Sequence, residues 1–279
     1  MFGDNVQVFL DIVIFISDRF YAYMLSMTRI GSFTTFFPLT GGDAMKGLWV
    51  TRTLFVMGLT FFIFPVVDNQ LPSTDMEFSL PFALLLLKEL LLGYLIAYLF
   101  SPILWIADAL GGFIDGQRGT GQENSQDSFT DEQTTPLGIC LIQTTVILIL
   151  VSGGLLIYFG FIFDTFVFWP PFSFLPSFSN PEMLTLFLTR LVVTVELTLV
   201  LAAPVVIATF LTDWSLGLLN RFAQQMNVYV LAMSIKSAVA LAVLVVYGGI
   251  MFTVLLKAVY TTPVFVNEVV TIFGKGILK

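Results

Sequence analysis

The sequence contains no histidine and only one cysteine, Cys140, among its 279 residues. The first absence removes the commonest general base and metal ligand, and the second excludes an internal disulfide and a thiolate metal cluster. The sequence also lacks the H-E-x-x-H, phosphate-loop and G-x-S-x-G motifs of common enzyme classes. We therefore expect a protein that is not an enzyme and that holds no metal and no cofactor.

Charged residues are scarce as well, at 11% of the chain, whereas soluble domains carry roughly 25%. Hydrophobic residues make up 57% of the sequence, and the mean hydropathy is +0.93. The apolar runs are unbroken, unlike the alternating segments of about ten residues in outer-membrane barrels. The net charge is −7 and no basic stripe is present, so a nucleic-acid partner is not expected. The composition predicts an all-α integral membrane protein.

The first residues do not have the pattern of a cleaved signal peptide, which begins with a basic region. Asp4, Asp11 and Asp18 occur there and no cation precedes them. We expect this first helix to stay in the mature protein.

Apolar runs alternate with polar or proline-containing connectors along the chain. Residues 30–39 are too short to span a bilayer alone, residues 80–107 are expected to bend at Pro102, and residues 137–168 are expected to break at Gly153-Gly154 because they exceed the bilayer thickness. The predicted apolar elements are residues 6–27, 30–39, 48–67, 80–107, 137–168, 182–212 and 239–259.

The longest hydrophilic interval, residues 108–136, is called the polar island below. It holds five glycines, six carboxylates and a single cation, Arg118. Glycine frees the backbone and like charges resist collapse, so the middle of the island is predicted to be a mobile loop. Such a loop between membrane helices acts as a gate, a plug or a docking loop, or only as a solvated connector. Thr135 and Pro136 have the pattern of a helix start.

Several charges interrupt the apolar runs, and each costs about 2.5 to 3.5 kcal/mol near the bilayer centre on insertion scales. Lys88 and Glu89 either pair near an interface or face an aqueous conduit. Prolines and glycines in the same runs predict broken helices, which need a covering of protein or water at membrane depth. These patterns favour a subunit of a larger assembly that encloses a path. The charges predicted to be buried at subunit interfaces are Lys88, Glu89, Arg190, Glu196 and Asp213.

An ordered series of motifs then carries a family resemblance. In the first half these are GGFIDGQRG, TTPLG, SGGL at residues 152–155 and WP at Trp169-Pro170. In the second half they are AAPVV at residues 202–206, LGLLNRFAQQMNVY ending at Tyr229, and SIKS at residues 234–237. From about residue 29 to about residue 259 the sequence resembles the SctT/SpaR/FliR family, the export-gate subunits of type III secretion systems and of the bacterial flagellum.

The resemblance implies that one copy of this chain joins SctR/FliP-like and SctS/FliQ-like subunits in a helical export gate at the bacterial inner membrane. The gate, partly on the periplasmic side, would conduct unfolded proteins and contact an SctU/FlhB-like switch protein. It also implies that residues 1–200 are SctR/FliP-like, that residues 201–260 form an SctS/FliQ-like hairpin, and that residues 261–279 are a tail. The long acidic island favours an injectisome over a flagellum.

The family resemblance also implies roles for individual residues. The island would be a plug loop over about residues 111–136, and the turn of the hairpin would be a cytoplasmic tip that contacts partners. The implied plug residues are Gly111, Gly112, Asp115, Gly116, Gln117, Arg118, Gly119, Thr135 and Pro136. The implied tip residues are Arg221, Gln224, Gln225, Asn227 and Lys236.

Two other hypotheses fit the composition. A self-contained transporter or channel for a small solute would use Glu89, Arg190, Glu196 and Asp213 as an intramembrane site, and it would favour an internal repeat that the sequence does not show. A membrane scaffold without a conduit would bind the same partners but seal nothing.

Overall fold

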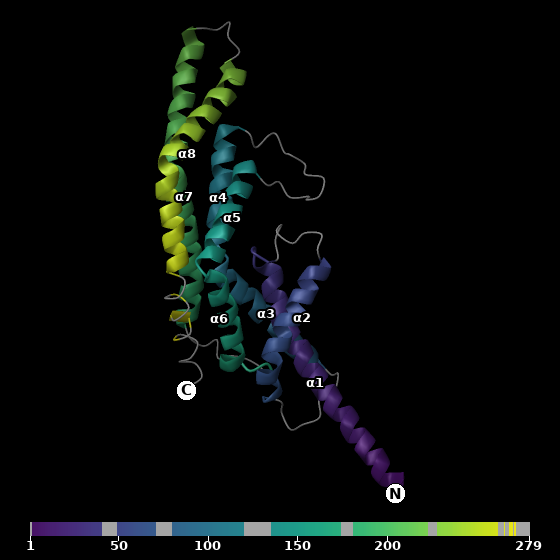
Figure 1. Ribbon diagram of the computed structural model, residues 1–279. Helices are drawn as coiled ribbons and strands as arrows, with labels where there is room; N and C mark the ends of the chain where they lie inside the picture. The colour runs from purple at the N-terminus through teal and green to yellow at the C-terminus, as the bar shows by residue number, and fades with distance from the viewer. Residues whose placement is uncertain are drawn as a thin grey trace. The chain divides into compact units, whose positions relative to one another are not determined.

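The computed structural model describes residues 2–40, 49–70, 80–119, 135–173, 181–222, 228–261, 265, 268–269 and 271. The described part contains eight α-helices and no strand (Figure 1), which confirms the all-α prediction. The helices are α1 (Phe2–Phe36), α2 (Trp49–Asp68), α3 (Leu80–Phe100), α4 (Pro102–Arg118), α5 (Pro136–Val151), α6 (Gly154–Phe168), α7 (Pro181–Phe222) and α8 (Val228–Tyr260).

Four of these helices are long and apolar enough to cross a membrane, namely most of α2, α3, α7 and α8. The helices α5 and α6 meet at a bend of 74°, and together they would count as a fifth, broken span. The break falls at the predicted place. Gly153 has a φ of +75°, a left-handed conformation that a residue with a side chain rarely adopts.

The chain divides into two compact units. The first comprises Met1–Ser101, Leu156–Leu186 and Val264–Lys279, and the second comprises Pro102–Leu155 and Phe187–Pro263. The boundary predicted at residue 200 lies within α7, which runs without interruption through Pro204, and the predicted domains stay a prediction. Membrane helices accept an internal proline more readily than soluble helices do. The likeness of residues 201–260 to a partner subunit stays a prediction.

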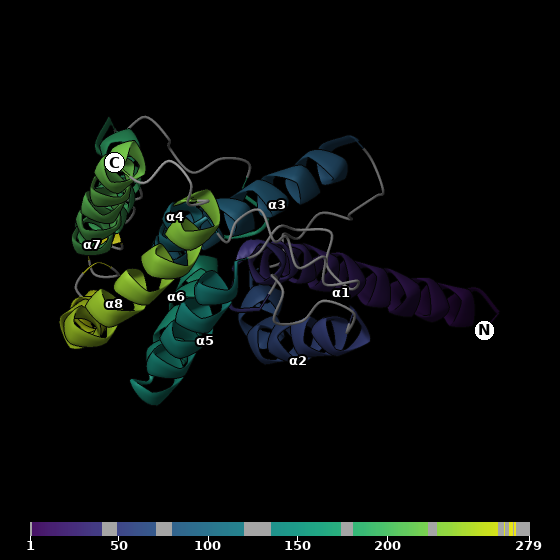
Figure 2. The same ribbon diagram turned by 90° about the horizontal axis from the view of Figure 1, so that it is seen from above.

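In the first unit α1 packs against α2 and α3 (Figure 2). The separate elements predicted at residues 6–27 and 30–39 are one helix of 35 residues, so that prediction was wrong. Gly31 does not end α1, because this part of the helix is held on both sides by α2 and α3. The crossing of α1 and α3 is tight at Gly93, where an added Cβ would lie 2.8 Å from the Cβ of Ser32. A side chain at this position would therefore force α1 and α3 apart.

Aromatic side chains join α6 to the same unit. Tyr158 packs edge-on against Phe37 at 5.2 Å between ring centroids, and Phe100 lies 5.0 Å from Phe161. Such edge-to-face pairs stabilise contacts beyond the area that they bury. The end of α3 and the end of α1 therefore meet on one face of α6.

In the second unit α4 packs against α5, and α8 contacts both. The core lies between the apolar faces of α4, α5, α7 and α8, with Leu110, Leu141, Val205 and Leu255 among its buried members. The element predicted to end at residue 212 continues to Phe222, because Leu216 is buried and Asp213 pairs with Lys236 of α8. The described part of the second hairpin helix begins at Val228, earlier than the apolar run predicted from residue 239.

Candidate functional site

The candidate site is the corner at which the polar island leaves α4 and rejoins the helices at α5. We call residues 108–119 and 135–138 the island base. The plug residues from Gly111 to Arg118 were predicted in a loop, but they lie in α4, which ends at Arg118. Residues 120–134, including the acidic middle of the island, lie outside the described residues.

The first third of the island is helical because its apolar residues face the core. Ile106, Leu110 and Ile114 are spaced by four residues and are almost completely buried. Gly119 follows the last helical residue with a φ of +82°. This left-handed residue is a common helix ending and glycine adopts it without steric cost. The helix α4 therefore continues seven residues beyond Gly111 before it ends at Arg118.

The two helices touch backbone to backbone at Gly111 and Gly138. A Cβ added to Gly111 would lie 2.8 Å from the carbonyl carbon of Leu137 and closer still to the backbone of Gly138. Ordinary carbon–carbon contacts are about 3.5 to 4.0 Å. The neighbouring Gly112 has no such constraint, since the nearest atom to its added Cβ is the Thr135 hydroxyl at 3.9 Å. Of these two adjacent glycines, only Gly111 is required by packing.

Asp115 connects the end of α4 to the start of α5. Its carboxylate is completely buried, accepts a hydrogen bond of 2.8 Å from the backbone N–H of Leu137, and forms an ion pair with Arg118. The first N–H groups of a helix have no partner within it, and the N-terminus favours negative charge. Asp115 thus serves as a cap for α5, supplied from the preceding helix.

Thr135 caps α5 from the other side, as predicted. Its hydroxyl accepts a 3.2 Å hydrogen bond from the N–H of Gly138, and Pro136 occupies the first helical position. Between them, Thr135 and Asp115 satisfy two of the free N–H groups at the start of α5. Both ends of the island are consequently fixed to the same corner.

Arg118 is the only cation of the island, and its side chain is 11% exposed. One terminal nitrogen binds Asp115, while the buried Nε has no hydrogen-bond partner among the described residues. A charged donor in such a place favours a carboxylate or carbonyl acceptor.

The residues predicted for the hairpin tip are only partly within the described structure. Arg221 lies exposed in the last turn of α7, whereas Gln224, Gln225 and Asn227 lie outside the described residues. Lys236, predicted at the tip, forms an ion pair of 2.6 Å with Asp213, predicted at a subunit interface. The two predicted groups therefore share a contact that joins α7 to α8.

Lys88 and Glu89 lie in the first unit within a buried charge cluster. Glu89 is completely buried and bonds Arg29 through both oxygens, at 2.5 and 3.0 Å, while Lys88 lies 2.7 Å from one of them. Glu89 thus has both of its partners, Arg29 and Lys88, within this chain, while the position of Lys88 and Glu89 at a subunit interface stays a prediction. Removal of one member of a buried pair leaves an uncompensated charge, at a cost of about 3 to 5 kcal/mol.

Arg29 was not predicted as a site residue, although an arginine inside an apolar run indicates a buried charge that needs a partner. Two carbonyl oxygens near the end of α6 accept from it, those of Thr165 at 2.9 Å and Trp169 at 2.8 Å. Lys88 donates to the carbonyls of Pro171 and Ser173. Cations are favoured at a helix C-terminus, where the carbonyls lack partners. The cluster with its excess positive charge therefore holds α1 and α3 to the end of α6.

The other predicted interface charges do not form one site. Glu196 and Asp213 are exposed and Arg190 is half-buried, all on α7. From Arg190 to Asp213 the helix rises by roughly 35 Å at about 1.5 Å per residue. This separation argues against a shared solute site on α7.

The fold and the site thus define a multi-pass membrane protein in which a polar segment is fixed between paired helices. Residues 20–262 match the model of bacterial export proteins, family 1, so the chain belongs to this family.

Three relatives agree with the family match. The Yop proteins translocation protein T of Yersinia pestis is 33% identical over 225 residues, which cover 81% of this chain and 85% of that protein. The surface presentation of antigens protein SpaR of Salmonella typhimurium is 28% identical over 223 residues, covering 80% and 81%. The flagellar biosynthetic protein FliR of Bacillus subtilis is 28% identical over 242 residues, covering 86% and 90%. The predicted family is confirmed, and with it a role in a bacterial export apparatus at the inner membrane.

Proposed function

We propose that this chain is the export-gate subunit that completes a channel with SctR/FliP-like and SctS/FliQ-like subunits, and that its polar island seals that channel at rest. The main observation in favour of the plug is the geometry of the island base. The buried carboxylate of Asp115 ties the last turn of α4 to the first N–H groups of α5, so both ends of residues 120–134 leave from one fixed corner.

The reach of the plug follows from its length. The 15 residues between Gly119 and Thr135 extend at most about 3.3 to 3.6 Å each, which makes roughly 50 Å of chain and a reach of about 25 Å from the base. A channel up to about 25 Å wide would therefore lie within the reach of this segment. Opening then requires only that an entering chain displaces a loop of low ordering energy, without any chemical step.

Arg118 supports this role by its position. Its buried Nε keeps a donor for a further acceptor, and four of the island's carboxylates (Glu123, Asp127, Asp131 and Glu132) occur in the segment that follows it. In the proposed resting state one of these carboxylates binds Arg118. An exported chain would replace that contact when it displaces the loop.

The length of α7 supports the proposal that partner subunits surround this chain. Its 42 residues rise by about 63 Å, whereas the hydrocarbon core of a bilayer is about 30 Å thick and helix tilts rarely exceed about 40°. Large apolar side chains are exposed near both ends, with Leu184 at 65% and Phe222 at 88%. Lipid covers only part of such a helix, so other proteins must cover the rest.

The plug is tested by a deletion of residues 121–130, which leaves α4, Gly119 and the Thr135 cap intact. In cells that carry the complete gate we expect a raised ion leak across the inner membrane. The matched control deletes residues 71–76, in the polar connector between α2 and α3. An unchanged leak after the island deletion, with normal protein levels, would contradict the plug and would favour a scaffold.

The assembly is tested separately by purification of the tagged chain in mild detergent, with and without its genomic neighbours. We expect small partner-like membrane subunits to co-purify. A monodisperse monomer that moves a solute alone would instead support the transporter hypothesis.

A further inference from the structure

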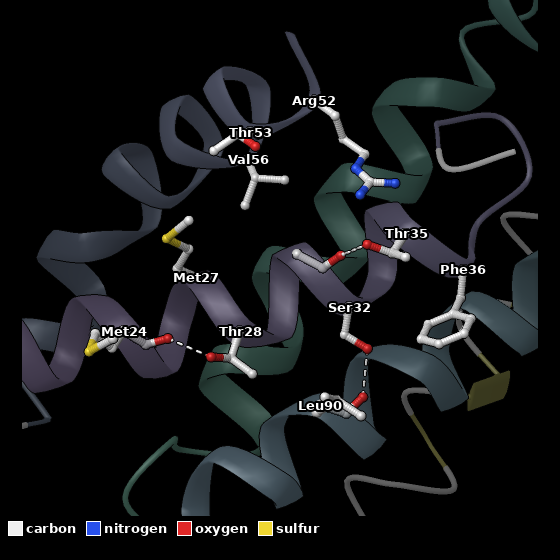
Figure 3. Close-up of a pocket in the computed structure, with 11 residues that line it drawn as sticks. Met24, Met27, Thr28, Ser32, Thr35, Phe36, Arg52, Thr53, Val56 and Leu90 are labelled. Atoms are coloured by element: carbon white, nitrogen blue, oxygen red, sulfur yellow. Dashed lines mark hydrogen bonds between the residues drawn. The ribbon is translucent and has the colours of Figure 1, made fainter. Parts of the chain in front are cut away.

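The first unit carries an open groove of about 430 Å³ between α1, α2 and α3 (Figure 3). The floor is the face of α1 from Met24 to Phe36, and the walls include Val56 of α2 and Leu90 of α3. A volume of this size is in the range of pockets that bind small molecules. Neither the family's role in export nor the proposed plug uses this groove.

The length of the groove matches one leaflet of a bilayer. The 12 residue steps from Met24 to Phe36 correspond to about 18 Å along α1, and half of a hydrocarbon core is about 15 Å. This length fits an extended hydrocarbon chain lying along α1.

The hydroxyl groups that line the groove are already satisfied. Thr28 donates to the carbonyl of Met24 at 2.8 Å, Ser32 to that of Leu90 at 2.6 Å, and Thr35 to that of Gly31 at 2.7 Å (Figure 3). Because these donors are bound to backbone oxygens, they do not need water. These three hydroxyl groups thus stay paired when an apolar occupant fills the groove.

Arg52 is the one charged residue of the groove lining, and it lies near its Thr35 end (Figure 3). It is half-buried and makes no hydrogen bond or ion pair with a residue that the structure describes. It belongs to the first turn of α2, close to Val50, where the apolar span of this helix starts. With α2 across a bilayer, the guanidinium would lie near the membrane–water boundary. A guanidinium at this level matches the phosphate of a lipid headgroup in charge and geometry.

We propose that this groove binds one anionic phospholipid, with an acyl chain along α1 between Met24 and Phe36 and with the headgroup phosphate on Arg52. The outer face of α2 is suited to a lipid environment, since Leu54, Phe61 and Phe62 are between 63% and 75% exposed. The length of α2, 20 residues or about 30 Å, also equals the hydrocarbon thickness. The groove therefore opens beside an apolar surface that is suited to lipid.

Native mass spectrometry of the delipidated complex tests the proposal. Phosphatidylglycerol and phosphatidylethanolamine with identical acyl chains are added in turn, and the bound fraction is measured. We expect a preference for phosphatidylglycerol that Arg52→Gln weakens about tenfold, as expected for a charged hydrogen bond. Arg52→Lys should keep part of the preference. The control is Lys257→Gln, an exposed cation near the end of α8 and outside the groove, which should change nothing.

A second arm identifies the occupant directly. A photo-reactive residue at Met27, inside the groove, should crosslink to lipid in intact membranes, and Gly31→Leu, which fills the groove, should abolish that crosslink. A crosslink to another protein subunit would overturn the lipid assignment. Equal retention of the two lipids, or no effect of Arg52→Gln, would overturn the headgroup contact.

Discussion

The sharpest test of the island base uses two adjacent glycines in α4. Gly111→Ala places a Cβ 2.8 Å from the carbonyl carbon of Leu137 and closer to the backbone of Gly138, whereas Gly112→Ala meets nothing nearer than 3.9 Å. At Gly111 the obstacle is backbone, which cannot turn aside as a flexible side chain can. The helices α4 and α5 must separate by about 1 Å to restore an ordinary contact.

The expected magnitudes have opposite signs. Overpacking of this kind costs about 1 to 3 kcal/mol, and more where backbone must move. Gly112→Ala removes a flexible residue from a helix and should stabilise the protein by up to about 1 kcal/mol. Gly116→Ala, with nothing within 4 Å of its added Cβ, should behave like Gly112→Ala.

The assay is the thermal unfolding midpoint of the purified complex in detergent, followed by ion leak in cells. Gly111→Ala should lower the midpoint, and it should raise the leak because separation of α4 and α5 moves the Asp115 carboxylate away from the N–H of Leu137. The two control variants should do neither. If Gly111→Ala is as stable as Gly112→Ala, the backbone contact at this corner is not as the structure describes it.

Three further predictions concern buried polar groups and close helix contacts. Asp115→Ala should lower the free energy of unfolding by about 1 to 3 kcal/mol more than Asp115→Asn does, because asparagine still accepts a hydrogen bond from the N–H of Leu137. Equal unfolding midpoints of the two variants would refute the capping role. Glu89→Gln should destabilise the protein by about 3 to 5 kcal/mol, since it leaves Arg29 and Lys88 buried as like charges. The control Asp164→Asn, at an exposed position in α6, should change the unfolding midpoint little. Gly93→Ala should destabilise by about 1 to 3 kcal/mol while Gly58→Ala, with open space around it, does not, and equal midpoints would contradict the tight α1–α3 crossing.

Local stereochemistry made some features predictable from the sequence. Three features depend on the backbone conformation that a single proline, glycine or capping residue favours at its own position. They are the break before Pro102, the bend at Gly153 and the capped start of α5. The extension of α4 into the island was predictable in principle. Ile106, Leu110 and Ile114 already show the helical spacing, but the many glycines and carboxylates outweighed that pattern in our interpretation.

The partners of the buried charges were not predictable in this way. Arg29 meets Glu89 across 60 residues of sequence, and Asp115 meets the N–H of Leu137 across 22. No local pattern fixes such pairs, since they depend on how the helices pack. The sequence indicated only that charges inside apolar runs need partners, and it left open whether the partner is this chain, another subunit or water.

The two kinds of apolar surface in this chain call for two kinds of covering. In the first unit α2 matches the bilayer in length and its outer face is apolar. The one charged residue among those that line the groove beside it, Arg52, lies in the first turn of this helix. The helix α7, which begins in the first unit and continues through the second, exceeds the bilayer about twofold and exposes apolar side chains near both ends. Under the two proposals, lipid covers the first surface and neighbouring subunits cover the second. A subunit that inserts one part into lipid and adds another part to a ring of helices would account for this contrast.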